Sequence, residues 1–398
     1  MEWKELQTLV KRKIGYGIVQ PGPSVPKGVP IIKVNNIISG LYDTKHLDKT
    51  TVENDAKYQR TKLKGGELIV TVVGTCGKTA IVPIHFAGCN LVRATCLIDI
   101  EDETICKWIK YYIDSPHGQA YINRNLNTTV QATLNVKSLN EMPIPFYSDE
   151  YTSNVVNILS SLDRKIELNN KINADLEEMA QAIFKNWFVD FEPFKDGKFV
   201  DSELGMIPEG WKVGTLRDIT NNKTAKVKER NDVKVLSPVT SGELVLSEEY
   251  FTKQVFSSSI AKYKIVNKGD FAYNPARVNI GSIGRNEFDF DGCVSPVYVV
   301  FSVLDGYENY FDLFRKTDFF KDSVASLAIG GVRQSLSYDD LSSIVVIIPS
   351  ENAVEEFNNL YNQMKKTIKA NKLESSRLSL LRDTLLPRLM SGELEVPE

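Results

Sequence analysis

The sequence repeats itself once, and its end continues into its beginning. Residues 396–398 followed by residues 1–6 resemble residues 207–213, since each run places a Pro-Glu step shortly before Trp-Lys. Between these marks, each half has the same order: an extended region punctuated by glycine, a short polar stretch, an apolar run ending at proline, and a long helix. This cyclic duplication predicts two similar lobes related by an approximate two-fold axis. It suits a ligand with two similar binding sites a fixed distance apart, of which double-helical nucleic acid is the commonest.

The spacing of matching segments supports the duplication. Residues 74–78 (Gly-Thr-Cys-Gly-Lys) match residues 281–285 (Gly-Ser-Ile-Gly-Arg), which lie 207 positions later, whereas Leu139 and Leu341 lie 202 positions apart. Such a small drift in the offset is hard to obtain by chance. Because the repeating unit is about half of the chain, the pattern indicates a duplicated domain rather than a solenoid of short repeats.

The composition is that of a cytoplasmic globular protein. The 398 residues suffice for two or three domains, and 42% hydrophobic with 25% charged residues is an ordinary soluble composition. No apolar stretch approaches the ~20 residues that span a bilayer, and the first residues lack the features of a secretion signal. The five cysteines are odd in number, which favours reduced thiols over a disulfide framework. We therefore expect a cytoplasmic protein without a membrane partner.

The net charge of −3 does not by itself favour nucleic-acid binding. The acidic residues are concentrated in residues 150–209, which carry 12 Asp and Glu against 6 Lys and Arg. The two lobes are therefore neutral to mildly basic. A neutral lobe can still bind DNA if its basic groups share one face, so the charge permits DNA binding without indicating it.

Each lobe combines strand-like and helix-like segments. Runs rich in branched residues and bounded by glycine are typical of strands, and we expect mostly antiparallel pairing in both lobes. The strand-like runs are residues 29–34, 67–73, 232–236 and 296–301, and the short helical patterns are residues 105–113 and 310–320.

Two long segments, residues 152–188 and 353–390, have apolar residues in steps of three and four, which predicts a coiled-coil seam. Each seam contains an asparagine that can fix the register, unless it lies at the wet edge of the seam. We expect Pro387 to end the second helix, and Pro193 follows the first. The residues expected in the coiled coil are Leu162, Asn169, Ile172, Leu176, Met179, Ile183, Met364, Asn371, Leu378, Leu381 and Leu385.

A helix of roughly 35 residues is about 50 Å long, whereas one turn of B-DNA is ~34 Å. Two such helices packed antiparallel, one after each lobe, form a rigid spacer. The lobes can then read two short sequences separated by unread base pairs. The expected fold class is α+β, with two similar mixed lobes separated by two long antiparallel helices that form a coiled coil, in a pseudo-two-fold cyclic arrangement.

This layout resembles the specificity subunit of type I restriction-modification systems over essentially the whole chain. The segments that carry the resemblance are residues 162–173 (Leu-Asp-Arg-Lys-Ile-Glu-Leu-Asn-Asn-Lys-Ile-Asn), 184–191 (Phe-Lys-Asn-Trp-Phe-Val-Asp-Phe), 202–211 (Ser-Glu-Leu-Gly-Met-Ile-Pro-Glu-Gly-Trp) and 385–394 (Leu-Leu-Pro-Arg-Leu-Met-Ser-Gly-Glu-Leu). The resemblance implies two target recognition domains that each read one half of a split DNA sequence. It also implies that the helices dock two modification (methyltransferase) subunits and that a restriction and translocation subunit joins the larger complex. Such a subunit performs no chemistry itself and needs no cofactor. The implied boundaries are residues 1–150 for the first recognition domain, 151–192 for the first helix, 193–209 for a linker, 210–350 for the second recognition domain, and 351–398 for the second helix and tail.

Polar loops recur at matching places in both lobes and supply the candidate DNA contacts. Amide and guanidinium groups suit the edges of adenine and guanine, and a tight glycine turn can present N–H groups and a basic side chain to a phosphate. The alternatives are a structural hairpin for the glycine turn, a surface salt bridge for Arg277, and helix capping or turn formation for the polar stretches. The candidates are Lys33, Asn35, Asn36, Thr75, Lys78, Thr128, Thr129, Gln131, Asn274, Arg277, Asn279, Arg285, Arg333 and Gln334.

Three motifs suggest other functions, but each lacks residues that the function requires. Residues 74–79 lack the first glycine of a phosphate-binding loop, since position 72 is valine. Residues 274–277 (Asn-Pro-Ala-Arg) are similar to the Asn-Pro-Pro-aromatic loop of DNA amino-methyltransferases but lack the aromatic that would stack on a flipped base. The cysteines contain no Cys-x-x-Cys pair, so we expect no metal. No catalytic constellation stands out. The remaining alternative is a scaffold whose duplicated lobes bind proteins and never DNA.

Overall fold

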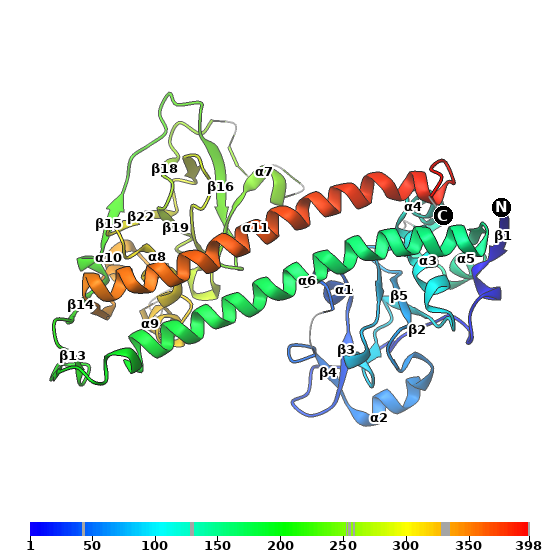
Figure 1. Ribbon diagram of the computed structural model, residues 1–398, viewed down its shortest axis with the longest axis horizontal. Helices are drawn as coiled ribbons and strands as arrows, with labels where there is room; N and C mark the ends of the chain where they lie inside the picture. Colours follow the sequence, from blue (N-terminus) through cyan, green and yellow to red (C-terminus); the bar gives the residue numbers. More distant parts are fainter. Residues whose placement is uncertain are drawn as a thin grey trace. The chain divides into compact units, whose positions relative to one another are not determined.

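The computed structural model describes residues 1–41, 44–127, 131–251, 253, 256–257, 259–327 and 335–396 (Figure 1). The chain divides into two compact units. The first unit is Met1–Asn170 with Lys372–Glu398, and the second unit is Lys171–Asn371. Each unit therefore contains one lobe and a stretch of both long helices.

The lobe of the first unit is built around a four-stranded sheet of order β2-β8-β5-β6. Its middle strand β5 has two buried faces: Leu68 and Val70 pack toward the helices, and Ile69 packs toward a smaller sheet of order β4-β3-β7. This is why the strand reads as a continuous run of branched residues. The strands are β1 (Glu2–Glu5), β2 (Gly15–Tyr16), β3 (Val29–Ile32), β4 (Lys49–Thr50), β5 (Leu68–Thr71), β6 (Thr79–Ile81), β7 (Asn90–Leu91), β8 (Thr95–Ile98), β9 (Leu126–Asn127), β10 (Thr133–Leu134) and β11 (Pro143–Phe146). The helices are α1 (Val34–Ser39), α2 (Val52–Asp55), α3 (Glu103–Asp114), α4 (Pro116–Arg124) and α5 (Val136–Asn140).

The lobe of the second unit repeats this architecture. Its central sheet has the order β15-β22-β19-β20, and a second sheet has the order β17-β16-β21-β18. In β19, Phe271 and Tyr273 face one core while Ala272 faces another. The strands are β12 (Phe199–Val200), β13 (Ile207–Pro208), β14 (Lys212–Thr215), β15 (Thr220–Lys223), β16 (Lys234–Pro238), β17 (Leu244–Leu246), β18 (Lys264–Val266), β19 (Phe271–Tyr273), β20 (Ile283–Arg285), β21 (Gly292–Val294), β22 (Val299–Val303) and β23 (Val345–Ile348). The helices are α7 (Ser247–Tyr250), α8 (Glu308–Phe314), α9 (Asp318–Leu327) and α10 (Tyr338–Ser342).

The pairing of the strands confirms the predicted duplication and the α+β class. The described strand pairs are antiparallel except β3 with β7 and β16 with β21, which occupy the same place in the two lobes. A buried acid immediately precedes the middle strand in both lobes and accepts backbone N–H groups of the preceding turn. Glu67 pairs with Arg12 in the first lobe, and Asp270 pairs with Lys223 in the second.

The structure corrects the alignment of the two glycine motifs. Leu68 lies opposite Ile81 in the β5–β6 hairpin, and Phe271 lies opposite Arg285 in the β19–β20 hairpin. Arg285 therefore corresponds to Ile81 and not to Lys78. The mismatch arises because the connection after β19 is longer than the connection after β5.

Two short elements also differ from the prediction. The strand predicted at residues 29–34 ends at Ile32, because Val34 begins α1. The single helix predicted at residues 310–320 is two helices, α8 and α9. The hydroxyl group of Thr317 accepts the backbone N–H of Phe320, which starts the second helix.

The two long helices, α6 (Asp149–Phe188) and α11 (Glu351–Met390), are 40 residues each. Within the first unit, Arg382 pairs with Asp163 at 2.7 Å, and Asn169 donates to Glu374 at 2.8 Å, so the later residue of one helix meets the earlier residue of the other. Within the second unit, the Asn371 amide donates to Asn173 at 2.9 Å, and the Phe184 and Phe188 rings pack on Phe357. The helices therefore run antiparallel in each unit.

Three residues predicted to lie inside the seam are exposed. Ile172, Met179 and Leu381 keep 43%, 50% and 47% of their surface, whereas Asn173, which was not predicted in the seam, keeps only 6%. A helix with 3.6 residues per turn drifts by about 20° per heptad from a 3.5-residue repeat, so the contact face moves off the predicted row. Asn169 is 1% exposed, which excludes the wet-edge alternative for that residue.

The prediction that Pro387 ends the second helix is wrong, because α11 continues to Met390. Leu386, Leu389 and Met390 are buried in the core of the first unit, and this packing holds the last turn in place. The tail residues Leu394 and Val396 pack against the same core, which also contains Leu6 near the start of the chain. In the part of the chain that is described, no helix has the length and apolar character needed to cross a membrane.

Candidate nucleic-acid interface

In the first unit, residues 72–78 connect β5 to β6 through a tight turn. Gly74 and Gly77 adopt left-handed backbone angles, with φ of 78° and 82°. The backbone N–H of Gly77 donates to the Thr71 carbonyl at 2.8 Å, which closes the turn. Thr75 and Lys78 are exposed on it. The glycines are needed because L side chains rarely adopt these angles.

The second polar stretch of this lobe lies against the same turn. The backbone N–H of Gly74 donates to the Ala132 carbonyl at 2.8 Å, and Val73 forms a β-bridge with Thr133. Gln131 is exposed beside them. The structure therefore brings Thr75, Lys78 and Gln131 together at one end of the central sheet. Thr128 and Thr129 lie outside the described residues.

The second unit has its exposed loop at the same place. Residues 274–282 connect β19 to β20, and the Asn274 side-chain oxygen accepts the backbone N–H of Ala276 at 3.1 Å. Arg277 and Asn279 are exposed on this loop. The backbone N–H of Leu336 donates to the Pro275 carbonyl at 3.1 Å, which brings the segment after residue 334 against the loop. Arg333 and Gln334 lie outside the described residues.

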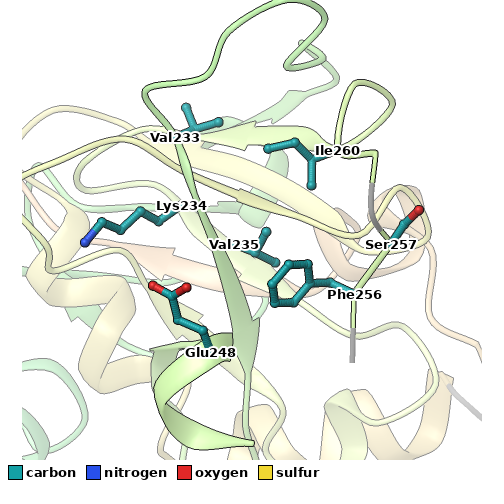
Figure 2. A pocket seen from close by; sticks show the side chains of 7 residues that line it. All are labelled: Val233, Lys234, Val235, Glu248, Phe256, Ser257 and Ile260. Carbon is teal, nitrogen blue, oxygen red and sulfur yellow. The ribbon is translucent and has the colours of Figure 1, made fainter. Parts of the chain in front are cut away.

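The second lobe contains two cavities, and residues of this loop line the larger one. The larger, which we name the Arg277 cavity, has a volume of about 400 Å³. The smaller, of about 280 Å³, has Lys234 and Glu248 on one side and Phe256 and Ile260 on the other (Figure 2). The Arg277 cavity is lined by Val235, Leu236, Ser237, Pro238, Val239, Thr240, Tyr250, Phe251, Phe256, Tyr263, Asn274, Arg277, Ser282, Ser295, Val297 and Tyr298.

The charges of the two cavities differ. The smaller contains a lysine and a glutamate, whereas Arg277 is the one charged residue among the described residues that line the larger. Burial raises the pKa of the Tyr298 phenol, and the positive charge of Arg277 opposes this shift. Arg277 and Tyr298 line the same cavity. This arrangement favours an electron-rich ligand.

Comparison with known proteins places this architecture in a family. Residues 22–178 match the family model described as type I restriction modification DNA specificity domain. The chain is 30% identical over 319 residues, 75% of this chain and 71% of the relative, to the type I restriction enzyme MjaIX specificity subunit of Methanocaldococcus jannaschii. The chain belongs to the family of type I restriction enzyme specificity subunits. This confirms the resemblance inferred from the sequence.

A second relative and one solved structure are also similar to this chain. The specificity subunit is 30% identical over 197 residues, 47% of this chain and 41% of the relative, to the EcoBI specificity subunit of Escherichia coli. The crystal structure of the S subunit from M. genitalium matches all of this chain and 96% of that chain, with a TM-score of 0.54 and 14% identity. At this identity the structural match concerns the fold alone.

Some predicted DNA contacts of this specificity subunit have structural partners instead. The Asn36 side chain accepts the backbone N–H of Lys33 at 2.7 Å at the start of α1, as the capping alternative predicts, and the Lys33 amine bonds to Asp48. That hydrogen bond lowers the pKa of Asp48. The guanidinium of Arg285 donates to Asn309 at 3.0 Å and lies over the Phe271 ring. Asn35 is exposed.

The five cysteines of the specificity subunit are unpaired, and burial raises the pKa of Cys96 and Cys106 to about 12. Thiols with such pKa values are packing groups rather than nucleophiles at neutral pH. Within the described ranges, no group of three or more His, Cys, Asp or Glu residues is placed to hold a metal ion.

The aromatic lining of the Arg277 cavity was missed at the sequence level. Tyr250 ends α7, Phe256 lies in the following segment, and Val297 and Tyr298 precede β22. These residues come from separate stretches of chain and share no spacing pattern. Only Asn274 and Arg277, which line the same cavity, were predicted from the sequence.

Proposed function

We propose that this specificity subunit reads a split DNA sequence in a type I restriction-modification complex, with one half read by each lobe. The observation that carries the proposal is the repeated hairpin. In both units, an exposed polar loop follows the middle strand of the central sheet, at residues 72–78 and 274–282. Lys78 and Arg277 are exposed on these loops. Basic and amide groups on the equivalent loops of the two lobes suit contacts to phosphates and base edges.

We further propose that α6 and α11 set the spacing between the half-sites and dock two methyltransferase subunits. Exposed apolar residues on these helices support docking. Met179 and Leu381 occupy the same position in the two helices, 30 residues after each helix starts, and keep 50% and 47% of their surface. A restriction and translocation subunit would join this complex, and the chain itself would carry out no chemistry. The lobe boundaries at residues 1–150 and 210–350, and a cytoplasmic location, stay predictions.

Selection from random duplexes tests the proposal. The subunit, assembled with its methyltransferase subunits, is mixed with a library of random duplex DNA, and the bound fraction is sequenced. We expect enrichment of two short sequences separated by a fixed number of unread base pairs. Enrichment of no split sequence would contradict the proposed function.

A second candidate function, a scaffold whose lobes bind proteins only, is favoured by the net charge of −3. The salt dependence of DNA affinity distinguishes the two. DNA binding through phosphates releases counterions, so affinity should fall steeply with salt. A flat dependence would favour the scaffold.

A further inference from the structure

We propose that the Arg277 cavity reads a guanine in the half-site bound by the second lobe. This inference rests on the proposed function and adds to it the base and the side chain that reads it. It depends on where the cavity lies, on its charge, and on the donors at its rim.

The cavity lies at the loop end of the central sheet, where the second lobe has its exposed polar residues. The hydroxyl of Ser282 donates to the Pro238 carbonyl at 2.8 Å, which joins the end of β16 to the loop before β20. At Gly281, φ is +92°, and a Cβ atom there would lie 2.8 Å from the Thr240 carbonyl oxygen. The cavity wall thus depends on a backbone approach that only glycine allows. Backbone contacts between these two segments, and not side chains alone, therefore form this part of the cavity wall.

Among the described residues, the Arg277 side chain has no hydrogen-bond or ion-pair partner, whereas Arg285 of the same unit donates to Asn309. Arg230 pairs with Asp232 and Asp291, and Arg315 pairs with Asp312. The guanidinium of Arg277 is therefore available for a ligand with acceptor atoms. A cavity of this size beside it is within the range of small-molecule and base-sized sites.

The rim of the cavity presents donors, which matches one base better than the others. The oxygen of the Asn274 amide accepts the backbone N–H of Ala276, and its NH₂ group, which has no hydrogen-bond partner among the described residues, is left to donate. Arg277 also only donates. In the major groove, guanine presents two acceptors, O6 and N7, whereas adenine and cytosine each present an N–H₂ donor and thymine presents one acceptor, O4, beside a methyl group. Two donor groups at one rim therefore favour guanine.

The lining beside these donors includes apolar and aromatic side chains that are partly exposed. Val297 keeps 71% and Tyr250 keeps 56% of its surface, and Tyr298 lies near the Arg277 charge. A base edge that enters the mouth would cover this surface. A phosphate could satisfy the same guanidinium, but it would gain nothing from the apolar lining. The chemistry common to both ligands is a pair of oxygen or nitrogen acceptors, and the experiment separates them.

The test uses the complex of the subunit with its methyltransferase subunits and compares three variants with the unchanged chain. Arg277→Ala removes the guanidinium, and Arg277→Lys keeps the charge but loses the planar fork that makes two parallel bonds. Lys268→Ala is the matched control, because it removes one exposed positive charge at the opposite end of β19, where Lys268 pairs with Asp289. Selection from random duplexes gives the preference at every position of both half-sites.

We expect both Arg277 variants to lose discrimination at one guanine of one half-site, by roughly 5- to 150-fold, the range for a bidentate base contact. The other half-site should keep its preferences, which also shows that the variants are folded. Lys268→Ala should leave both half-sites unchanged. If Arg277→Ala weakens binding equally on all sequences while Arg277→Lys binds normally, Arg277 contacts a phosphate and the inference is wrong. Unchanged preferences in both Arg277 variants would overturn it as well.

Failure of the inference and failure of the proposed function are distinguishable. If the unchanged complex selects no split sequence, the proposed function fails. If it selects a split sequence but no guanine depends on Arg277, only the reading role of the cavity fails.

Discussion

The buried Asp312–Arg315 pair should hold the hairpin that carries the Arg277 loop. Both side chains are 7% exposed, and their atoms approach to 2.6 Å. Arg315 also donates to the Ile283 carbonyl at 3.0 Å, so it ties α8 to the first residue of β20. Replacing Asp312 with alanine would leave a buried guanidinium without its anion. Breaking such a buried pair lowers the free energy of unfolding by about 3–5 kcal/mol. We expect a loss within this range because both side chains are almost fully buried.

Hydrogen exchange of the whole chain, measured by mass spectrometry, is the suitable assay because it resolves stability by region. We expect Asp312→Ala to speed exchange in peptides of the second unit and to leave peptides of residues 1–150 unchanged. Lys321→Ala is the control, since Lys321 pairs with Asp318 at the surface with 60% of its side chain exposed, and such pairs contribute about 0–1 kcal/mol. If Asp312→Ala lowers the free energy of opening in the second unit by less than about 1 kcal/mol, the reasoning is refuted. Such a small loss would mean that Arg315 does not depend on Asp312 to balance its buried charge.

Three further predictions follow from the same structure. Burial alone would raise the pKa of Asp312, but the positive charges of Arg315 and Lys316 outweigh it and lower this pKa to about 2. Because an aspartate in the unfolded chain titrates near pH ~3.9, the pair should stabilise the fold above that pH, and this stabilisation should be lost as pH falls toward 2. Hydrogen-exchange rates measured over the same acid range in the Asp312→Asn variant should not show this loss. Lys78→Ala should weaken binding about equally on all duplexes and reduce the salt slope by about one, and a change confined to one sequence would assign Lys78 to a base instead. Leu381→Asp should weaken methyltransferase assembly in size-exclusion chromatography with little change in thermal stability, since the side chain is already 47% exposed, and unchanged assembly would remove Leu381 from the docking surface.

Long-range repetition could be predicted from the sequence because it depends on order and spacing alone. The offset of 202 positions between Leu139 and Leu341 also separates the starts of α6 and α11 and the two short helices before them. These helices pack into the core of each lobe, so the number of residues between them is the same in both halves of the chain. The connection between the middle strand and the next strand is a surface loop, where length can change freely. The alignment of Gly77 with Gly284 failed there.

The helix pairing was predictable in type but not in detail. Steps of three and four residues identified two long helices, yet the contact face depends on how two helices drift along each other. Asn173 is buried and Ile172 beside it is exposed, which no count of apolar positions reveals. The packing of Phe184 and Phe188 on Phe357 fixes this face in the second unit.

The candidate site was predicted only where one loop supplied it. Asn274 and Arg277 belong to one short motif and were identified from their chemistry. The aromatic wall of the Arg277 cavity is assembled from α7, the segment around Phe256, and the approach to β22. Tertiary packing brings these segments together, and no spacing pattern in the sequence predicts that they line one cavity.

Base-resolution mapping of methylated DNA from cells that carry the complete complex would test whether two lobes read two half-sites. The proposed function predicts methylation within a sequence of two specified parts, separated by a constant number of unspecified base pairs. It also predicts that a substitution in the 274–282 loop changes only one part. A continuous recognition sequence, or a loop substitution that alters both parts together, would contradict it.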